Sequence, residues 1–361
     1  MSKLFEPLQV GSLTLPNRII MAPLTRSRAS AANGQERVPN DLMREYYVQR
    51  ASAGLILTEA TAVTPHGVGY VDTPGIWSSE QVAAWLRIAN AVHDAGGRIF
   101  SQLWHVGRVS HSDFLNGELP VSASALAVAG EIRVPSGHKP YEVPRALETD
   151  EIAGVIDDYR KGAQNAKAAG FDGVEIHGAN GYLLDQFLRG GSNQRVDEYG
   201  GSVENRARFL LETVDAAIEV WGADRVGVHL SPRDMEHHSM HDSDPAATFG
   251  YVARELGKRK IAFIFVRESV DESPRFGPEL KKQFGGIYIA NEGLTREQAD
   301  RVLEAGEADA LSWGQQFIAN PDLPLRLQRD APLNAPNPAT YYAPGAEGYV
   351  DYPTLELAEV G

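Results

Sequence analysis

Short apolar segments alternate with amphipathic segments along most of the chain. Eight of the apolar segments have the length and the bounding turn residues of buried β-strands, and the segments between them have helical periodicity. Eight such units in one chain are typical of an α/β protein with a (β/α)8, or TIM, barrel. From the pattern alone, a doubly wound parallel sheet remains the alternative. The predicted strands are residues 18–24, 54–60, 98–104, 173–176, 225–230, 261–267, 286–290 and 308–313.

Two segments do not fit the repeating unit. Residues 8–15 alternate around Gly11 and predict a hairpin that closes one end of the barrel. Residues 105–148 are rich in Pro and Gly, and loops of that length usually cover a site. We find no internal repeat and no linker, so we expect residues 1–361 to form a single barrel domain with 105–148 as a capping excursion after the third strand. The tail from residue 332 is too polar for a helix and is expected to wrap the barrel or reach its mouth.

Three helix starts can be placed by their sequence. Ser78-x-x-Gln81 and Thr295-x-x-Gln298 have the capping-box pattern, and Pro245 suits the first turn of a helix. These signals support the helical reading of the segments between the strands.

Three side chains able to donate or share a proton follow the strand at residues 173–176. The turn residues that end this strand place His177, Asn180 and Tyr182 at its C-terminal mouth, where parallel α/β proteins form their sites. The alternative is a hydrogen-bonded histidine and a packing tyrosine in an ordinary loop.

Charge and cysteine content exclude several classes of function. The formal net charge of −14 disfavours binding to nucleic acid or to an anionic membrane. The absence of cysteine excludes disulfides, thiolate zinc sites, iron–sulfur clusters and cysteine nucleophiles, and it suits a cytoplasmic protein. We expect neither a signal peptide nor a membrane span, because no apolar stretch is long enough.

A histidine-rich segment at residues 236–242 raises the question of a metal site. His237 and His241 would share one face of a helix. Because no metalloprotease-like motif such as His-Glu-x-x-His accompanies them, a hydrophilic loop over the barrel mouth is the favoured reading, and we expect no metal.

Several ordered motifs identify a family. They are Asn17-Arg18, Ala22-Pro23-Leu24-Thr25-Arg26, Gln102-Leu103-Trp104-His105-x-Gly107-Arg108, His177-Gly178-Ala179-Asn180-Gly181-Tyr182, the segment from Ser192 to Arg208, Phe317 to Leu323, and Gly348-Tyr349-x-Asp351-Tyr352-Pro353. Together they resemble the old yellow enzymes, which are FMN-dependent ene-reductases built on a (β/α)8 barrel. The resemblance covers nearly the whole chain.

The resemblance implies an NAD(P)H oxidoreductase that acts in two half-reactions. FMN at the barrel mouth would take hydride from NADPH or NADH and pass it to an activated alkene such as an enone, maleimide or nitroalkene, with nitroaromatics or nitrate esters as further substrates. His177 and Asn180 would hold the carbonyl oxygen, on which negative charge develops, and Tyr182 would donate the proton. Such an enzyme binds small molecules, and we expect a monomer or a homodimer.

The resemblance also assigns residues around the flavin. Thr25 would place its hydroxyl near a flavin carbonyl and Gln102 its amide at the pyrimidine edge, while Pro23 and Ala60 would give backbone contacts. Tyr70, Trp104 and Tyr352 match aromatic positions that line the substrate space.

Two positions depart from the family pattern. His229 stands where many members have an arginine that reaches the flavin, and Gln315 where they have one that faces the phosphate. Backbone N–H groups around Asn291 and Gly314 would then have to hold the phosphate, so FMN binding is expected to be weakened. Some bacterial xenobiotic reductases of the family resemble this chain in lacking both arginines. Two alternatives stay open: a flavin-free phosphate-binding barrel, such as an isomerase or aldolase, and a barrel that has lost catalysis and serves as a binding protein.

Overall fold

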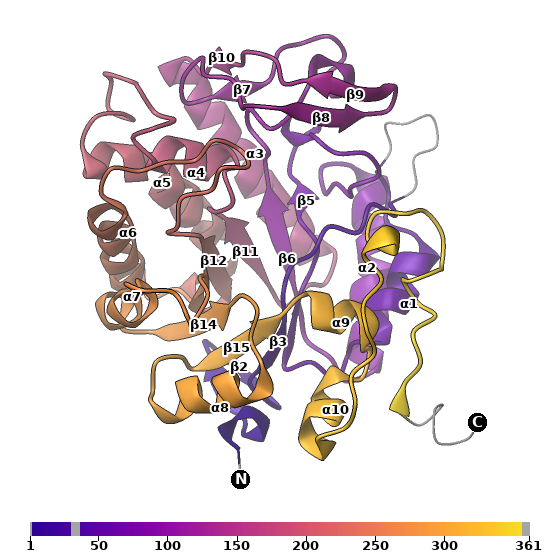
Figure 1. Ribbon diagram of the computed structural model, residues 1–361. Coiled ribbons are helices and arrows are strands. Elements are labelled where there is room, and N and C mark those ends of the chain that lie inside the picture. Colours follow the sequence, from indigo (N-terminus) through magenta and orange to yellow (C-terminus); the bar gives the residue numbers. More distant parts are fainter. Residues whose placement is uncertain (1, 30–36, 356–361) are drawn as a thin grey trace.

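A closed ring of parallel strands forms the centre of the computed structural model, which describes residues 2–29 and 37–355 (Figure 1). Each strand pairs with the next along the chain, and pairing of the last strand with the first closes the ring. The predicted barrel is therefore confirmed, and the doubly wound sheet is wrong. In order, the strands are β3 (Ile19–Met21), β4 (Leu55–Leu57), β6 (Ile99–Trp104), β11 (Gly173–His177), β12 (Val226–Leu230), β13 (Phe263–Arg267), β14 (Ile287–Asn291) and β15 (Ala310–Trp313).

Helices follow the barrel strands and cover the outside of the ring (Figure 1). Ser78 and Thr295 both form the predicted capping boxes, and Pro245 is the first residue of its helix. The α-helices are α1 (Asp41–Val48), α2 (Ser79–Asp94), α3 (Thr149–Ala168), α4 (Leu183–Leu188), α5 (Val203–Trp221), α6 (Pro245–Arg259), α7 (Gly277–Phe284), α8 (Arg296–Glu304), α9 (Gln315–Ala319) and α10 (Leu323–Arg329). Short 3-10 helices are η1 (Lys3–Phe5), η3 (Pro65–Gly67), η4 (Ser112–Phe114), η5 (Ala223–Arg225) and η6 (Pro338–Thr340).

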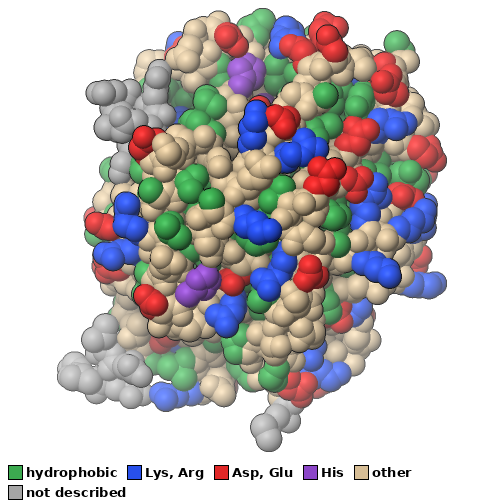
Figure 2. All heavy atoms as spheres, turned by 180° about the vertical axis from the view of Figure 1, so that it is seen from behind, with side chains coloured by type: hydrophobic (Ala, Val, Ile, Leu, Met, Phe, Trp, Pro, Cys, Tyr) green, Lys and Arg blue, Asp and Glu red, His purple; other side chains and the backbone are tan. Residues whose placement is uncertain are grey.

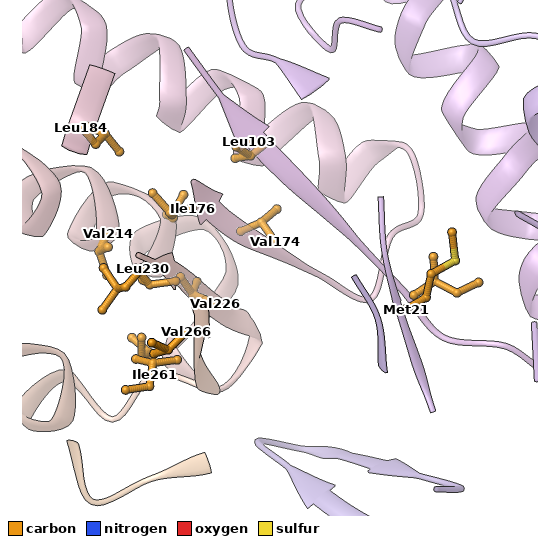
Figure 3. Packing of buried hydrophobic residues seen from close by; sticks show 14 of the residues in the cluster. Met21, Leu103, Val174, Ile176, Leu184, Val214, Val226, Leu230, Ile261 and Val266 are labelled. Atoms are coloured by element: carbon orange, nitrogen blue, oxygen red, sulfur yellow. The ribbon is translucent and has the colours of Figure 1, made fainter. Parts of the chain in front are cut away.

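Alternate residues of the barrel strands pack in two separate apolar layers, because successive side chains of a strand point to opposite faces. The outer layer lies between strands and helices; Figure 3 shows Val174 and Ile176 of β11 in this layer together with Leu184 of α4 and Val214 of α5. The inner layer fills the barrel and includes Phe100, Phe263, Phe265 and Ile289.

The predicted N-terminal hairpin closes the lower end of this inner layer. β1 (Leu8–Val10) and β2 (Leu13–Leu15) pair antiparallel, and Leu8, Val10 and Leu15 are buried in the same apolar cluster as the barrel interior. With its floor filled by side chains, the barrel can hold a ligand only at the opposite end, where the strands terminate.

The segment that follows β6 folds over the C-terminal end of the barrel (Figure 1). β5 (Thr61–Ala62) extends the sheet beside the end of β6, and a hairpin of β8 (Glu131–Val134) and β9 (Gly137–Pro140) lies above it. β7 (Val121–Ser122) and β10 (Arg145–Ala146) pair in parallel nearby. β7 to β10 lie within residues 105–148, for which a capping role over the site stays a prediction.

The C-terminal tail wraps back onto α1, as its composition predicted. Tyr349 is buried and its ring stacks on that of Tyr46, with centroids 4.2 Å apart. On the face seen in Figure 2, Lys and Arg side chains are interspersed with Asp and Glu. Within the part of the chain that the structure describes, no helix has the length and apolar character needed to cross a bilayer.

Candidate active site

Two adjoining cavities open where the barrel strands end. Cavity A, about 830 Å³, lies over the ends of β14 and β15, and cavity B, about 480 Å³, lies over the ends of β6, β11 and β12. One ligand could extend through both, because they have lining residues in common. The shared residues are Pro23, Leu24, Asn180, His229, Arg267 and Tyr342.

His177 is the last residue of β11 and lines cavity B. Its ring stacks on that of His229, with centroids 4.9 Å apart and planes inclined by 15°. Burial is the main cause that lowers the pKa of His177 to about 3, with smaller contributions from Arg267 and His238. The imidazole is therefore neutral near pH 7 and can donate one hydrogen bond from one ring nitrogen.

Asn180 is fixed by contacts on both its backbone and its side chain. It adopts a left-handed conformation with φ of 58°, its backbone N–H donates to Ser231 Oγ at 2.8 Å, and its carbonyl accepts from His238 Nδ1 at 2.7 Å. Its side-chain Oδ1 accepts from Arg267 Nη1 at 3.2 Å. Since the amide oxygen is occupied, the NH2 group remains as the donor that Asn180 can offer to a ligand.

Tyr182 stands beside His177 in the wall of cavity B. The two ring centroids are 5.2 Å apart, and the rings of Tyr182 and Trp104 pack edge to face with centroids 5.0 Å apart. The hydroxyl of Tyr182 lies 3.0 Å from that of Tyr70. Burial raises the pKa of Tyr182 well above its usual value, so the phenol keeps its proton and can act as a donor.

Gln102, Glu175 and His229 form a hydrogen-bonded floor under the two cavities. Gln102 Nε2 donates to Glu175 Oε2 at 2.7 Å and also faces His229 Nδ1 at 3.2 Å. Because Nδ1 then accepts, the proton of neutral His229 sits on Nε2, which is buried and has no partner among the described residues. His229 thus offers an unused hydrogen-bond donor at the junction of the cavities.

Gln102, Glu175 and His229 are all uncharged near pH 7. Burial raises the pKa of Glu175 to about 8, and burial together with the neighbouring His177 lowers the pKa of His229 well below its usual value. A flavin pyrimidine edge, which carries both donors and acceptors, therefore meets polar groups without a fixed negative charge. The amide and imidazole fit that edge.

Three arginines line cavity A, but each is already paired with a carboxylate. Arg267 Nη2 lies 3.0 Å from Glu292 Oε1, Arg296 Nε lies 2.8 Å from Asp300, and Arg326 Nε lies 2.7 Å from Asp322.

The remaining groups of cavity A that suit a phosphate are uncharged. The side chain of Asn291 donates to Ser312 Oγ at 2.8 Å, so its NH2 group is already engaged. Gly314 and Gln315 line the cavity at the end of β15. The residues present thus fit the ring of FMN. They fit its phosphate only through neutral donors, as expected where His229 and Gln315 replace two arginines.

The structure brings together nearly all of the residues singled out in the sequence. Only Tyr352 lines neither cavity; it is half-buried and its hydroxyl accepts a hydrogen bond from the backbone N–H of Asn337 at 2.9 Å. Tyr342, from the same tail, takes part in both cavities instead. Those lining cavity B are Pro23, Thr25, Ala60, Tyr70, Gln102, Trp104, His177, Asn180, Tyr182 and His229, and those added by cavity A are Asn291, Gly314 and Gln315.

The histidine-rich segment does not form a helix. It is a turn closed by a bridge between Met235 and Met240, and His241 Nδ1 lies 2.5 Å from Asp234. This is the loop that the sequence favoured, and His237 and His241 do not share a helical face. Among the residues that the structure describes, no cluster of three or more His, Cys, Asp or Glu could hold a metal ion.

Sequence reasoning missed several cavity-lining residues, among them Arg267, Glu292, His238 and Tyr342. Arg267 had a visible signal, since a charged residue that ends an apolar strand should face the mouth of a barrel. Glu292 follows the next strand in the same way. The positions of His238 and Tyr342 depend on long loops, whose paths no local pattern gives.

Comparison with known proteins identifies the family. The family model described as "NADH:flavin oxidoreductase / NADH oxidase family" matches residues 3–334. The chain belongs to this family. Among curated proteins, it is 43% identical over 360 residues to a probable flavin mononucleotide-dependent alkene reductase of Leishmania infantum, a match that covers 98% of this chain and 97% of that protein.

Solved structures of the family have the same fold. An old yellow enzyme homologue from Zymomonas mobilis superposes with a TM-score of 0.94 at 47% identity, over 98% of this chain and 99% of that one. Morphinone reductase in complex with tetrahydroNAD gives 0.93 at 49% identity, over 98% and 97%. The expected old yellow enzyme kinship is thus confirmed, as are FMN-dependent ene-reduction and a nicotinamide hydride donor. The flavin-free barrel is not favoured.

Proposed function

We propose that the protein reduces activated alkenes, including enones, maleimides and nitroalkenes, at the junction of cavities A and B. NADH or NADPH is the reductant, and nitroaromatics and nitrate esters are further substrates. FMN bound there supplies the group that accepts hydride from the nicotinamide and returns it to the alkene.

The residues that would hold FMN are those whose polar groups are available in the two cavities. Gln102 and the Nε2–H of His229 suit the pyrimidine edge, Thr25 a ring carbonyl, and Pro23 and Ala60 a flat contact through the backbone. At the other end, backbone groups at Asn291 and Gly314 and the side chain of Gln315 suit the phosphate.

His177 and Asn180 activate the alkene by holding its conjugated oxygen. Each can donate one hydrogen bond. Neutral His177 donates from a ring nitrogen, and Asn180 donates from its NH2 group, because Arg267 binds only its side-chain oxygen. Negative charge moves onto that oxygen when hydride reaches the far carbon, so two fixed donors lower the barrier. Removing one such donor costs about 2.7–4 kcal/mol in comparable sites.

Tyr182 completes the reduction by protonating the carbon next to the carbonyl. Its phenol is protonated at neutral pH and stands beside His177, and Tyr70 and Trp104 hold its ring in place. Tyr70 and Trp104 also line the substrate space of cavity B, and Tyr342 replaces Tyr352 as the aromatic residue from the tail.

One observation carries this proposal: two donors and one protonated phenol share a wall of the cavity whose floor presents Gln102 and His229. The test is a flavin reduction and reoxidation experiment without oxygen. In purified protein loaded with FMN, NADH or NADPH should bleach the flavin absorption, and 2-cyclohexenone should restore the oxidised flavin spectrum. Bleaching without reoxidation by any activated alkene would contradict the proposal. We also propose that the enzyme works in the cytoplasm, as a monomer or a homodimer, with no nucleic-acid partner.

A further inference from the structure

Tyr182 is connected to the loop of residues 231–244 through a line of hydrogen-bonding groups. Its hydroxyl lies 3.0 Å from that of Tyr70, and the Tyr70 hydroxyl lies 3.4 Å from His238 Nε2. His238 is partly exposed and lines cavity B, so it is the member of the line that water can reach. We propose that His238 and Tyr70 form a proton relay that orients the Tyr182 proton for each reduction and replaces it afterwards; this rests on the proposed role of Tyr182 as proton donor.

The backbone holds His238 in place for this task. The residue has a left-handed φ of 73°, which is unfavourable for histidine and persists only where surrounding contacts fix it. Arg108 Nη2 donates to its carbonyl at 3.0 Å. A Cβ atom on Gly181 would come within 2.7 Å of the His238 Cβ, so only glycine allows this approach.

The contact with Asn180 fixes the tautomer of neutral His238. Because Nδ1 lies 2.7 Å from the Asn180 carbonyl, which only accepts, the proton is on Nδ1 and Nε2 is an acceptor. Tyr70 then donates to His238, and Tyr182 donates to Tyr70. In this state the Tyr182 proton is directed away from a substrate.

Protonation of His238 reverses the direction in which these groups donate their hydrogen bonds. Nε2–H then donates to Tyr70, Tyr70 donates to Tyr182, and the Tyr182 proton is available to the substrate. After Tyr182 has given its proton to carbon, the phenolate takes one from Tyr70, Tyr70 takes one from His238, and His238 takes one from water. Each turnover thus consumes one solvent proton, and the three groups return to their starting state.

The surroundings keep His238 mostly neutral before turnover. Burial is the main cause that lowers its pKa to about 4; His237, Arg108 and Arg267 act in the same direction, and the hydrogen bond to the Asn180 carbonyl acts against them. A phenolate on Tyr182 or Tyr70 adds a negative charge beside the ring and favours the imidazolium when it is needed.

The test compares His238→Asn with the native enzyme in stopped-flow reoxidation of reduced flavin by 2-cyclohexenone. Asparagine can still donate to the Asn180 carbonyl but has no group at the position of Nε2. We expect the native rate to rise as the pH falls below neutral. In the variant the rate should be about tenfold lower and independent of pH over that range, a smaller loss than the 10²–10⁴-fold typical of removing the acid itself. Tyr70→Phe removes the hydroxyl between Tyr182 and His238 and should give the same lower, pH-independent rate.

His241→Asn is the matched control, since His241 lies in the same loop, is exposed, and pairs with Asp234 rather than with the relay. It should leave the rate and the pH profile unchanged. The proposed relay would be contradicted if His238→Asn kept the native pH profile, or if His241→Asn lost as much of the reoxidation rate as His238→Asn. Tyr182→Phe separates the two proposals: if it reduces enone at the native rate, the proposed function of Tyr182 fails as well.

A second readout needs no cofactor. In protein labelled with ¹⁵N-histidine, NMR shifts should show His238 as the Nδ1–H tautomer at neutral pH, and Tyr70→Phe should shift its Nε2 resonance. The Nε2–H tautomer at neutral pH would contradict the relay.

Discussion

Arg267 and Glu292 form an ion pair of 3.0 Å across the ends of β13 and β14, and both residues line cavity A. The guanidinium is therefore shared between a carboxylate and the Oδ1 of Asn180. In a site whose two expected arginines are replaced by His229 and Gln315, this pairing removes a cation that could otherwise attract a phosphate.

Glu292→Gln should therefore tighten FMN binding. The change removes a negative charge from the cavity and frees Arg267, and a charge-assisted hydrogen bond is worth about 1.5–3 kcal/mol, or about ten- to a hundredfold in affinity. We expect at least about a tenfold gain in a fluorescence titration of apoprotein with FMN. Glu297→Gln is the control, because Glu297 lines the same cavity without pairing with Arg267. Equal gains in both variants would mean that only net charge matters.

The backbone of Glu292 predicts an unusual order of stabilities. Its φ of 118° lies in a region that glycine adopts readily and other residues do not. Glu292→Gly and Glu292→Ala both remove the ion pair, so their difference reports the backbone alone. We expect the glycine variant to be more stable than the alanine variant by about 1 kcal/mol or more, the reverse of the usual order. Urea denaturation measures this, and an alanine variant of equal or greater stability would argue against strain at this position.

Glu175 makes stability depend on pH in a stated direction. Burial raises its pKa from 4.5 to about 8, so between these values the folded protein holds a proton that the unfolded chain has released. Its contribution to stability is fully present below pH 4.5 and is lost as the pH rises toward 8, by about 1.4 kcal/mol per pH unit. Glu175→Gln, which can still accept from Gln102, should flatten this decline in urea denaturation measured across that range. An unchanged slope would show that Glu175 is ionised in the folded protein.

The barrel could be predicted from sequence because its evidence is local and repeated. Each strand shows as a short apolar run, and capping residues such as Ser78 and Thr295 fix helix starts regardless of the rest of the fold. The position of His177 and Asn180 followed from the end of a single strand. Gln102 and His229, by contrast, were placed in the site by resemblance alone, and only the structure shows that they share a hydrogen bond.

What the sequence did not predict depends on long-range packing. The tail contributes Tyr342 rather than Tyr352, because the chain turns back at Asn337 and binds the Tyr352 hydroxyl there. His238 enters the site through a turn closed between Met235 and Met240; the sequence predicts a loop here but does not show which of its histidines reaches the cavity. Such positions are set by contacts between distant segments, which no periodicity reveals.

His177 and Asn180 should also bind a phenolate, which resembles the charged oxygen of a substrate in the course of reduction. Stacked on oxidised flavin, a phenolate is an electron donor and should give a long-wavelength absorption band. The double variant His177→Ala with Asn180→Ala should lose this band while it keeps the spectrum of bound FMN, as measured by titration with a para-substituted phenol. If the double variant still gave the band and bound the phenol with undiminished affinity, the phenolate oxygen would have to bind to other residues.

In the proposed mechanism, Tyr182 in the wall of cavity B is the acid that protonates the alkene after it has received hydride. The most direct measurement is stopped-flow spectroscopy of the two half-reactions in Tyr182→Phe. Reduction of the flavin by NADH or NADPH needs no proton donor and should keep its native rate, whereas reoxidation by 2-cyclohexenone should slow by about 10²–10⁴-fold. Equal slowing of both half-reactions, or no slowing of reoxidation, would contradict the role of Tyr182 as the acid.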